Sequence, residues 1–569
     1  MFFCAAAFLI LLVSGCEARG VNGGLSCAAC TIVFGLADQL AEIHNESLLA
    51  GSLRVCDMLP SPGNDYCRDI VKLVWPLLVN REVSKYFTPD VFCYGIDVCY
   101  TEENTGFCHL FPRPLSNFRN TVHQIKKVTA QNGRGKEYQQ HLERLGIALC
   151  HIPGIKQICD MFNKTWMKTE PAIDLDGDRF SIVNTARGYH WRGRDCEDWN
   201  PLAYPGREPE NGDTAADYNC NGIWGIDQKS GKPYEDEFCK ETGSRGLIII
   251  GDSVSAHFHF PEAWMNPLLI SNYVLHNYTE HLLDELDWPH LGYATGFTNT
   301  TEPLLIKGRT DSIYLRLRDR NLCNHRDYQN ICRNGDSSFD AVKRVKSIAR
   351  NKNRDKPALV IYGLFGNDVC NNHADTISNM TTPEEYRKNV MEVLSALDTM
   401  LPKGSHVLLI GLVDGSFIYP EMANRFHPLG KFRRDIRYRD VYKWFTCMEI
   451  GPCVGWMTSN ETLRQITSQR AQELSDVLEN IAKEQKFSSF EVFYLENPIH
   501  QVFKEWTEKG NQVWQLLDPV DSFHPNQIAQ PLIAENLWRD ISKKFPQALG
   551  ETNPHNERIR KIFGDQNGH

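Results

Sequence analysis

An apolar run that stops at a Gly-Asp-Ser turn constrains the fold of this chain more than any other feature. Residues 247–250 indicate a buried strand, and Gly251-Asp252-Ser253 follows it directly, which would place a serine oxygen at the edge of a sheet. Far downstream, Asp521 and His524 stand three residues apart in Asp-Ser-Phe-His-Pro. A serine hydroxyl is a poor nucleophile until a base removes its proton, and an imidazole does this best when a carboxylate fixes its tautomer. We therefore predict a triad of Ser253, His524 and Asp521. A helix cap would explain the Asp–His spacing alone, but not the serine block.

The region between these blocks alternates strand and helix patterns. Apolar runs at 359–362, 407–412 and 492–494 are typical of buried strands, and the apolar periodicity over 463–481 predicts a long amphipathic helix between the last two. Alternating strands and helices favour an α/β domain, over residues 241–550, with a parallel sheet covered on both faces.

A third block, Gly-Leu-Phe-Gly-Asn-Asp, directly follows the strand predicted at 359–362. A tetrahedral acyl intermediate needs hydrogen-bond donors aimed at its oxyanion, and the side-chain amide of Asn367 can supply one. Together the three blocks resemble the SGNH (GDSL-type) hydrolase family. The resemblance implies a flavodoxin-like sheet and an oxyanion hole built by the serine, the asparagine and a glycine. For that glycine we choose Gly296 over Gly292.

Two further groups of residues have less specific interpretations. His257 and His259 alternate with phenylalanines beside the nucleophile, and we expect them to shape the pocket, because further zinc ligands are not found. The basic stretch at 431–439 would either clamp phosphate groups or form a solvated face.

Composition and cysteine usage set the compartment. The 569 residues exceed what one core usually holds, so we expect two or three domains, and the net charge of -10 argues against a nucleic-acid partner. Residues 1–20 are typical of a signal peptide, and no later stretch predicts a transmembrane helix. Nineteen cysteines then indicate disulfides formed in an oxidising compartment, and the seventeen after the signal leave one thiol unpaired or paired between chains. Glycosylation sequons occur at Asn45, Asn163, Asn277, Asn299, Asn379 and Asn460.

The first domain, predicted over residues 23–105, is a small helical module. Apolar residues recur at helical spacing over 30–41 and 70–78, between cysteines Cys27, Cys30, Cys56, Cys67, Cys93 and Cys99. The module resembles a saposin B-type domain, and that resemblance implies the pairs Cys27–Cys99, Cys30–Cys93 and Cys56–Cys67. A domain of this kind can open and present its apolar face to lipid. The alternative is a prodomain or chaperone that the disulfides merely stabilise.

Residues 106–165 form a polar, basic linker in which proteolytic processing is expected. A cysteine such as Cys108 or Cys453 would then hold a small and a large chain together.

Residues 170–240 are rich in acidic side chains on alternate positions. Oxygen ligands of this density favour structural Ca²⁺, because crowded carboxylates repel one another without a cation. The alternative is a solvated acidic loop, and no EF-hand loop is present. The proposed ligands, which would also help to fix how the first domain meets the second, are Asp174, Asp176, Asp178, Asp195, Asp198, Asp213, Asp217, Asn219, Asn221 and Asp227.

The order of these regions, from signal through saposin-like domain and acidic segment to SGNH domain, is similar to that of the acyloxyacyl hydrolase family. The resemblance implies a serine lipase that removes secondary acyl chains from lipid A of lipopolysaccharide, that also acts on phospholipids, and that is processed into disulfide-linked subunits. Secretion and lysosomal delivery both remain open. An esterase acting on other acylated lipids or glycans, and a non-enzymatic lipid carrier, are the alternatives.

Overall fold

The computed structural model describes residues 21–59, 88–101, 106–111 and 165–569, with short stretches between 64 and 72 and between 119 and 127. The predicted signal peptide and most of the linker lie outside these residues. So does most of the helix expected over 70–78.

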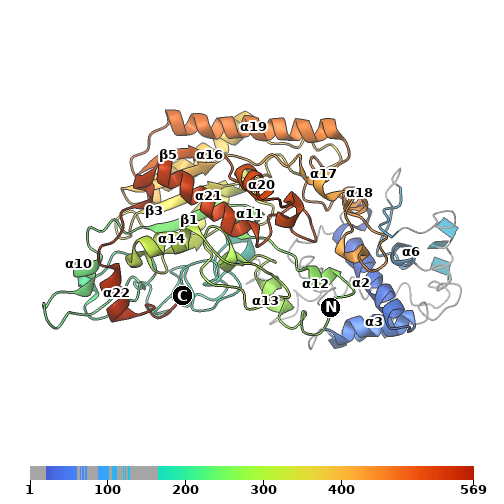
Figure 1. Cartoon of the computed structure of the whole chain (residues 1–569), viewed down its shortest axis with the longest axis horizontal. Coiled ribbons are helices and arrows are strands. Elements are labelled where there is room, and N and C mark those ends of the chain that lie inside the picture. The colour runs from blue at the N-terminus through green and yellow to red at the C-terminus, as the bar shows by residue number, and fades with distance from the viewer. Residues whose placement is uncertain are drawn as a thin grey trace.

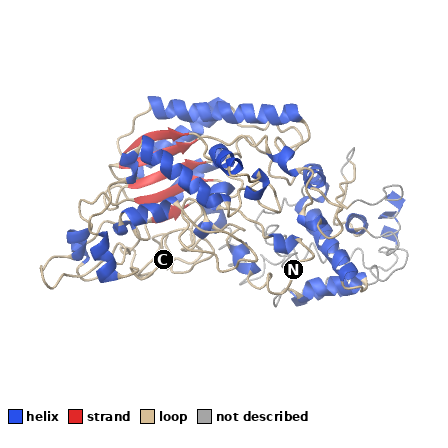
Figure 2. Cartoon of the chain, in the orientation of Figure 1, coloured by secondary structure: helices blue, strands red, loops and turns tan. Residues whose placement is uncertain are grey.

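A five-stranded parallel sheet forms the centre of the larger domain (Figure 2). Its strands are β1 (Gly246–Gly251), β2 (Tyr328–Asn330), β3 (Ala358–Gly363), β4 (Ser405–Ile410) and β5 (Phe490–Leu495), in the order β2-β1-β3-β4-β5. This is the flavodoxin-like order expected from the resemblance. All four predicted strands are confirmed, whereas β2 escaped prediction because its three residues, Tyr-Gln-Asn, form no apolar run.

Helices cover both faces of the sheet. In Figure 1, α16 (Pro383–Met400) lies behind the strands and α21 (Ala529–Lys544) in front, while α19 (Glu461–Glu484) runs along the top edge. The predicted helix over 463–481 is thus confirmed as α19, between β4 and β5. Strands β1, β3 and β4 are buried along their whole length, which explains their continuous apolar sequences.

Shorter helices complete the larger domain. Those before β3 are η4 (Asn211–Asp213), α10 (Tyr234–Phe238), α11 (Ser253–Ala256), α12 (Glu262–Met265), α13 (Tyr278–Leu283), η5 (Pro289–Leu291), α14 (Ile313–Arg320), η6 (Leu322–Asn324), α15 (Ser338–Arg344) and η7 (Val345–Ser347). Those after β4 are α17 (Ile418–Met422), η8 (Pro428–Gly430), α18 (Tyr438–Met448), α20 (Ile499–Glu508), η9 (Val513–Leu516), η10 (Pro546–Leu549) and α22 (Asn556–Phe563).

The first domain is helical where the structure describes it, with η1 (Val21–Gly23), α2 (Gly24–Ile43), α3 (Leu48–Asp57) and α6 (Pro89–Gly95). The three disulfides implied by the saposin resemblance are all present: Cys27–Cys99, Cys30–Cys93 and Cys56–Cys67. By length and composition the helix over Val21–Ile43 could cross a membrane, which the sequence analysis did not anticipate. Two-thirds (67%) of its most apolar window is nevertheless buried, as in a core helix.

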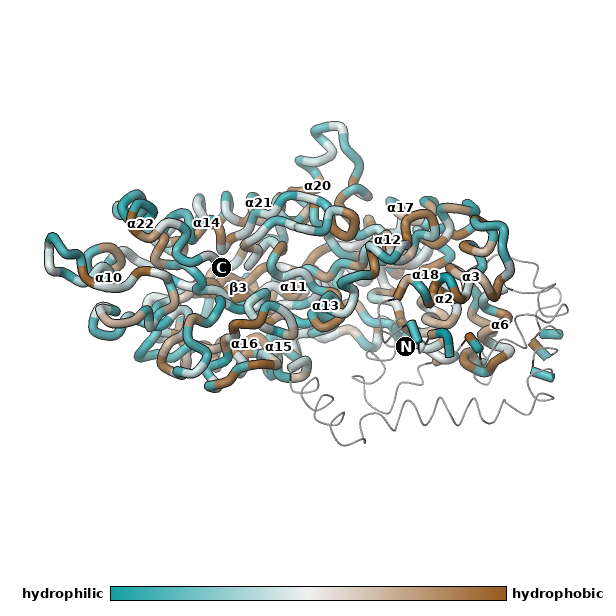
Figure 3. Tube along the Cα trace, turned by 90° about the horizontal axis from the view of Figure 1, so that it is seen from below, coloured by the Kyte–Doolittle hydropathy of each residue, from teal (hydrophilic) through white to brown (hydrophobic). Residues whose placement is uncertain are grey.

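The two domains share a hydrophobic core. Apolar residues of α2 and α6 pack in one cluster with residues of α12, α13 and α18, and Figure 3 shows brown segments of α2 and α18 close together. Cys108 forms a disulfide with Cys447 at the end of α18, and the Gln39 amide donates to the carbonyl of Leu429 at 2.9 Å. The prediction of a covalent link through Cys108 is confirmed, whereas Cys453 pairs with Cys370.

The basic stretch at 431–439 serves this contact between the domains. The Arg433 guanidinium lies 2.8 Å from Asp38 and 2.6 Å from Glu42, both on α2. Neither a phosphate clamp nor a solvated face describes Arg433 correctly, since it binds carboxylates of the first domain.

The acidic segment packs against the edge of the sheet. Backbone hydrogen bonds join Trp191 and Gly193 to β2, at 2.6 Å to Asn330 and 2.9 Å to Tyr328. The segment therefore covers an edge strand, and α10 lies at the opposite end of the molecule from α2 and α3 (Figure 1). The expectation that it fixes the contact between the two domains is wrong.

The seven disulfides of the described residues indicate folding in the oxidising secretory pathway. Within the same residues, Cys332 is free and buried.

Candidate active site

The predicted nucleophile lies where β1 ends and the short helix α11 begins. The Asp252 carboxylate caps α11 by accepting the amide of Val254 at 3.0 Å. Its other oxygen accepts the amides of Phe365 and Gly366, at 2.6 and 3.2 Å, in the loop after β3. Asp252 thus fixes the serine turn to the loop that carries Asn367. Because β1 and β3 are neighbours at the switch point of the strand order, this is where a flavodoxin-like sheet binds its ligand.

The three triad residues converge. The His524 Nε2 lies 2.7 Å from the Ser253 Oγ, and the His524 Nδ1 lies 2.5 Å from the Asp521 Oδ2. The second oxygen of Asp521 accepts the amides of Phe523 and His524 at 2.7 and 3.1 Å. These bonds fix the carboxylate within its own turn, so the imidazole is held in one tautomer and orientation.

The electrostatics suit a general base. Burial lowers the pKa of His524, but the charge of Asp521 and its hydrogen bond outweigh burial, so the net shift is upward. Burial raises the pKa of Asp521, and the His524 imidazole with the two backbone amides outweighs it, so that carboxyl stays ionised. A raised imidazole pKa makes His524 a stronger proton acceptor for the serine.

Asn367 lies beside Ser253 in the same pocket. One hydrogen of its side-chain amide is donated to the carbonyl of Asp336, at 3.0 Å, in the loop after β2. That bond fixes the amide plane and leaves its second hydrogen for an oxyanion. The Ser253 amide, at the first residue of α11, is also among the groups that a helix start leaves without an intrahelical partner.

Gly296 does not reach this pocket. Its amide donates to the carbonyl of Gly292 at 3.0 Å and its carbonyl accepts the Ser312 hydroxyl at 2.6 Å. A Cβ at residue 296 would lie 2.5 Å from the Gly292 oxygen, so close packing of this loop explains the glycine. The predicted oxyanion role is therefore wrong, because the amide is already used. Gly292 lies against His257 instead.

A second histidine–aspartate pair, which the sequence analysis missed, supports the triad. His259 Nδ1 lies 2.7 Å from the Asp518 Oδ2, and both side chains are buried. The other Asp518 oxygen accepts the amides of Val520 and Asp521, at 2.8 and 3.1 Å. His259 thus shapes the site as expected, and the repeated Asp-x-x-Asp-x-x-His spacing was the available signal for Asp518. His257 also lies inside, with its Nδ1 3.1 Å from the carbonyl of Trp288.

The pocket at Ser253 is apolar and narrow. Its walls include Phe365, Val413, Phe417, Ile418, Trp456, Ile499, Phe503, Leu517 and Phe523. Its volume of about 30 Å³ is far below the roughly 300 Å³ or more that is typical of ligand pockets, so the side chains leave little room for an acyl chain. Such a lining suits an alkyl chain rather than a sugar or a charged group.

The predicted calcium ligands separate into two clusters. In the first, carboxylate oxygens of Asp174, Asp176 and Asp178 lie within 4.8 Å of one another. Four carboxylates here each keep one buried oxygen that accepts no hydrogen bond, namely those of Asp176, Asp178, Asp195 and Asp198. Among the protein's own groups, burial and the charge of Asp195 raise the pKa of Asp178 to about 8. A cation among these oxygens would satisfy them, so the residues fit Ca²⁺.

The second cluster surrounds Glu235 of α10, which the sequence analysis missed. Its Oε1 accepts the amides of Asn219 and Asn221, while its Oε2 is buried and accepts none. Burial, with Glu235 nearby, raises the pKa of Asp213 to about 7 and of Asp217 to about 6. Asp227 is not brought to either cluster, because its carboxylate accepts the Lys229 amide and the Ser230 hydroxyl in an exposed turn.

The sequons lie mostly at the surface. Asn45, Asn299, Asn379 and Asn460 are exposed, Asn277 is half-buried, and Asn163 lies outside the described residues. Glycosylation at each stays a prediction.

Comparison with known proteins agrees with this geometry. The model of the GDSL-like Lipase/Acylhydrolase family matches residues 247–537, and that of the Saposin-like domain matches 26–160, which extends beyond the predicted boundary at 105. The chain is 42% identical to the acyloxyacyl hydrolase of Homo sapiens over 96% of its own length and 94% of that protein. It is 41% identical to the acyloxyacyl hydrolases of Mus musculus and Oryctolagus cuniculus, over 96% of its length and 94% and 93% of theirs.

The chain belongs to the acyloxyacyl hydrolase family. It is therefore a carboxylic ester hydrolase with a saposin-like domain before a GDSL-type domain. The hydrogen-bonded order of Ser253, His524 and Asp521 suits the roles of nucleophile, general base and orienting carboxylate in such an enzyme.

Proposed function

We propose that this enzyme removes the secondary, acyloxyacyl-linked fatty acyl chains from lipid A of bacterial lipopolysaccharide and so detoxifies it. The observation that carries the proposal is a hydrogen-bonded Ser–His–Asp triad at the end of a largely apolar pocket. The name shared by the relatives describes the same bond, an acyl group carried on another acyl group. Hydrolysis of phospholipids by the same site is part of the proposal, because an apolar slot selects the acyl chain and not the headgroup.

In the proposed mechanism His524 accepts the Ser253 proton as the Oγ attacks the carbonyl carbon of the ester. The charge of Asp521 stabilises the imidazolium, and the Asn367 amide and the Ser253 N–H donate to the oxyanion. When the intermediate collapses, His524 donates its proton to the leaving hydroxyl of the lipid. Water then attacks the acyl-enzyme with His524 again as base, which releases the fatty acid and restores the serine.

A third oxyanion donor is assigned to the loop after β2, in place of Gly296. The amide of Arg333 in this loop binds the carbonyl of Gly251 at 3.2 Å, and Asp336 accepts the Asn367 amide. The loop thus lies against both the serine turn and the asparagine. Gly335 within it is exposed, has a φ of 78°, and leaves open space where a Cβ would stand, so its amide can approach a substrate closely.

The saposin-like domain is proposed to draw the lipid from a membrane or an aggregate. Its apolar helices pack on the hydrolase domain around Leu429 and Cys447, close in sequence to the elements that line the acyl pocket. Because that pocket leaves little room in the structure, an acyl chain enters only as side chains such as Phe417 and Phe523 move aside. Lipid contact by the first domain would supply the chain to this entrance.

Structural Ca²⁺ is proposed at the two acidic clusters. Asp174, Asp176, Asp178, Asp195 and Asp198 would hold one ion, and Asp213, Asp217, Asn219, Asn221 and Glu235 a second. The buried, unpartnered carboxylate oxygens support this assignment. The ions would neutralise the clusters and so hold the segment on the β2 edge, with no part in the hydrolysis.

The proposal also includes proteolytic processing in the linker, which would give two chains joined through Cys108–Cys447. The enzyme would be delivered to the cell exterior, to lysosomes or to both. The disulfide supports the processing, since it would keep the chains together after cleavage. On a gel, secreted protein should give one band without reductant and two with it. A single band under both conditions would contradict processing.

The substrate is tested by mass spectrometry of purified lipopolysaccharide after incubation with the enzyme. We expect loss of the acyloxyacyl-linked chains only, with the directly attached hydroxyacyl chains retained, and no loss with Ser253→Ala. Intact lipid A together with cleavage of simple esters would favour a broader esterase instead. Release by the Ser253→Ala protein would contradict the proposed site.

A further inference from the structure

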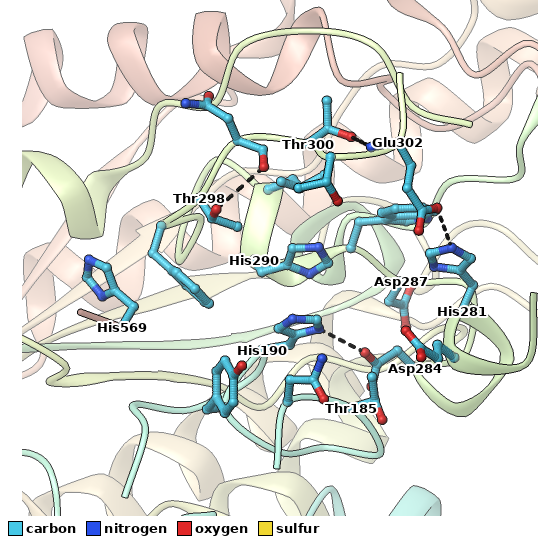
Figure 4. Close-up of a pocket in the computed structure, with 18 residues that line it drawn as sticks. Thr185, His190, His281, Asp284, Asp287, His290, Thr298, Thr300, Glu302 and His569 are labelled. Carbon is cyan, nitrogen blue, oxygen red and sulfur yellow. Dashed lines mark hydrogen bonds and ion pairs between the residues drawn. The ribbon is translucent and has the colours of Figure 1, made fainter. Parts of the chain in front are cut away.

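A second cavity, of about 450 Å³, lies next to the catalytic segment and plays no part in the hydrolysis described above (Figure 4). The backbone of residues 257–259 pairs with that of 286–288, through the amides of His259 and Trp288 at 3.0 Å each. The first of these segments follows α11, which begins at Ser253, and Asp287 and Trp288 of the second line the cavity. The cavity is of the size typical for small-molecule sites.

The lining is polar and carries no positive side chain. In Figure 4 the labelled histidines and carboxylates lie around the middle of the cavity, between Thr298 and Thr300 on one side and Thr185 on the other. None of the eighteen lining residues is Lys or Arg. Aromatic faces of Tyr189, Trp288 and Phe297 complete it. This composition is the opposite of that of the acyl pocket.

Some of these groups satisfy one another. His190 Nδ1 lies 3.2 Å from an oxygen of Asp284, whose other oxygen accepts the Trp191 indole N–H at 3.1 Å. His281 Nε2 lies 2.9 Å from Glu302. These pairs need no ligand.

Two groups are left without partners. Asp287 is only 2% exposed, and neither of its carboxylate oxygens has a donor at hydrogen-bonding geometry. The amide of Asn334 is a close polar neighbour, and one hydrogen of that amide is donated to the carbonyl of Glu285 at 3.1 Å. The buried Nδ1 of His290 also lacks a partner. Burial raises the pKa of Asp287 well above its ordinary value. Buried polar atoms of this kind are rare, because each costs free energy, and they indicate an occupant that supplies hydrogen bonds.

The chemistry of the lining limits the class of ligand that can bind in the cavity. A phosphate or sulfate would find no cation, and an alkyl chain would leave the polar atoms unpaired. A metal ion is not favoured either. Among the described residues, sets of three ligating groups within 4.8 Å of one another occur in the acidic segment, and none of them lies in this cavity. A saccharide has many hydroxyl donors for Asp287 and the histidines, and apolar ring faces that pack on aromatic side chains.

We propose that this cavity is a carbohydrate-binding site that takes one or two pyranose rings. The proposal does not depend on the substrate of the esterase site. The sugar comes from one of two sources. One is a saccharide in solution, and the other is the glycan of this chain itself, since the sequon residue Asn299 stands at the rim of the cavity.

The test is binding of N-acetylglucosamine and N,N′-diacetylchitobiose to the full-length enzyme, measured by saturation-transfer NMR. It is made with the glycosylated protein and with Asn299→Gln. Binding to both proteins identifies a site for free saccharides, whereas binding to Asn299→Gln alone identifies a site that the protein's own glycan fills. In either case Asp287→Asn and His290→Gln, made in the variant that binds, should weaken binding at least about tenfold.

The matched control is Asp319→Asn, the same chemical change at an exposed carboxylate of α14, which should leave binding unchanged. Circular dichroism verifies that each variant is folded, and His290→Gln keeps the test open if Asp287→Asn does not fold. Absence of saturation transfer with both proteins would overturn the proposal. Equal binding by folded Asp287→Asn and His290→Gln would do so too, as would Zn²⁺ binding that Asp287→Asn abolishes.

Discussion

Two buried histidine–aspartate pairs lie side by side in this enzyme, and only one of them contacts the serine hydroxyl. His524 contacts Asp521 at 2.5 Å, and His259 contacts Asp518 at 2.7 Å. The pairs differ at the far nitrogen of each ring. His524 Nε2 faces the Ser253 hydroxyl at 2.7 Å, whereas His259 Nε2 faces the carbonyl of Leu305 at 2.9 Å.

That difference decides what each pair can do. A carbonyl oxygen only accepts, so the Nε2 of His259 must carry a hydrogen and cannot accept a proton from a nucleophile. Burial lowers the pKa of His259, but Asp518 and the Leu305 carbonyl outweigh it and raise the pKa. A hydroxyl can donate, so the Nε2 of His524 can accept the Ser253 proton. The partner of the second nitrogen, and not the carboxylate, makes a histidine a base.

The largest effect is expected from breaking the catalytic pair at its reacting end. Ser253→Ala and His524→Ala should each lower kcat by about 10⁴-fold or more, because the nucleophile or its base is lost. The double variant should be no slower than either single one, since the two residues act as a unit. Fatty-acid release from an acylated substrate measures this. If the loss of kcat in the double variant equalled the two single losses multiplied together, the residues would act in separate steps, which would contradict the proposed mechanism.

A smaller loss is expected from Asp521→Asn, about 10⁴-fold or less, because the tautomer is no longer fixed. The pH dependence tests the electrostatics. Since the base acts when neutral, activity falls as the pH drops through the pKa of His524, which Asp521 raises. Removing that charge should move the acid limb of kcat/KM to lower pH. An acid limb that stays in place in Asp521→Asn would show that another group titrates, and Asp319→Asn is the control.

The oxyanion donors come next. Asn367→Ala should lower kcat by about 10²- to 10³-fold with little change in KM, because its amide serves the transition state and not the bound ester. Gly335→Ala should lower kcat less, through strain at a φ of 78°. Gly296→Ala is the informative comparison. It should disturb packing and lower the free energy of unfolding. A loss of kcat with the free energy of unfolding unchanged would instead support the oxyanion role that the sequence predicts for Gly296.

These residues differ in how far the sequence predicts them. Ser253 and Asn367 each follow a buried apolar strand, and Asp521 and His524 share one turn, so local patterns place all four. His259 and Asp518 are 259 residues apart, so the local spacing around Asp518 marks that carboxylate but does not indicate which histidine it contacts. Glu235 and Arg433 were missed or misread for the same reason, because each finds its partners only after distant segments pack together.

The glycine of the oxyanion hole shows a different limit. Glycine is needed wherever backbones approach closely, so Gly296 and Gly335 are equally plausible from sequence. The missing information was β2, whose three polar residues form a strand only because β1 and the acidic segment pair with its two edges. Unless β2 is predicted, the sequence does not show that the loop after it, which contains Gly335, lies beside Asn367. Tertiary pairing thus overrides local propensity here.

The smallest effect on catalysis is expected from the supporting pair. In Asp518→Asn the remaining side-chain oxygen can still accept the amides of Val520 and Asp521. The new NH2 group then faces the His259 ring, which stays buried without its carboxylate partner. Breaking such a pair should lower the free energy of unfolding by about 3 kcal/mol. While the protein stays folded, kcat should fall less than tenfold, because Asp521 still holds His524 through its own turn. Chemical denaturation and fatty-acid release, measured on the same preparation beside Asp521→Asn, separate the two roles. A loss of kcat in Asp518→Asn as large as in Asp521→Asn, with stability unchanged, would mean that both carboxylates take part in proton transfer.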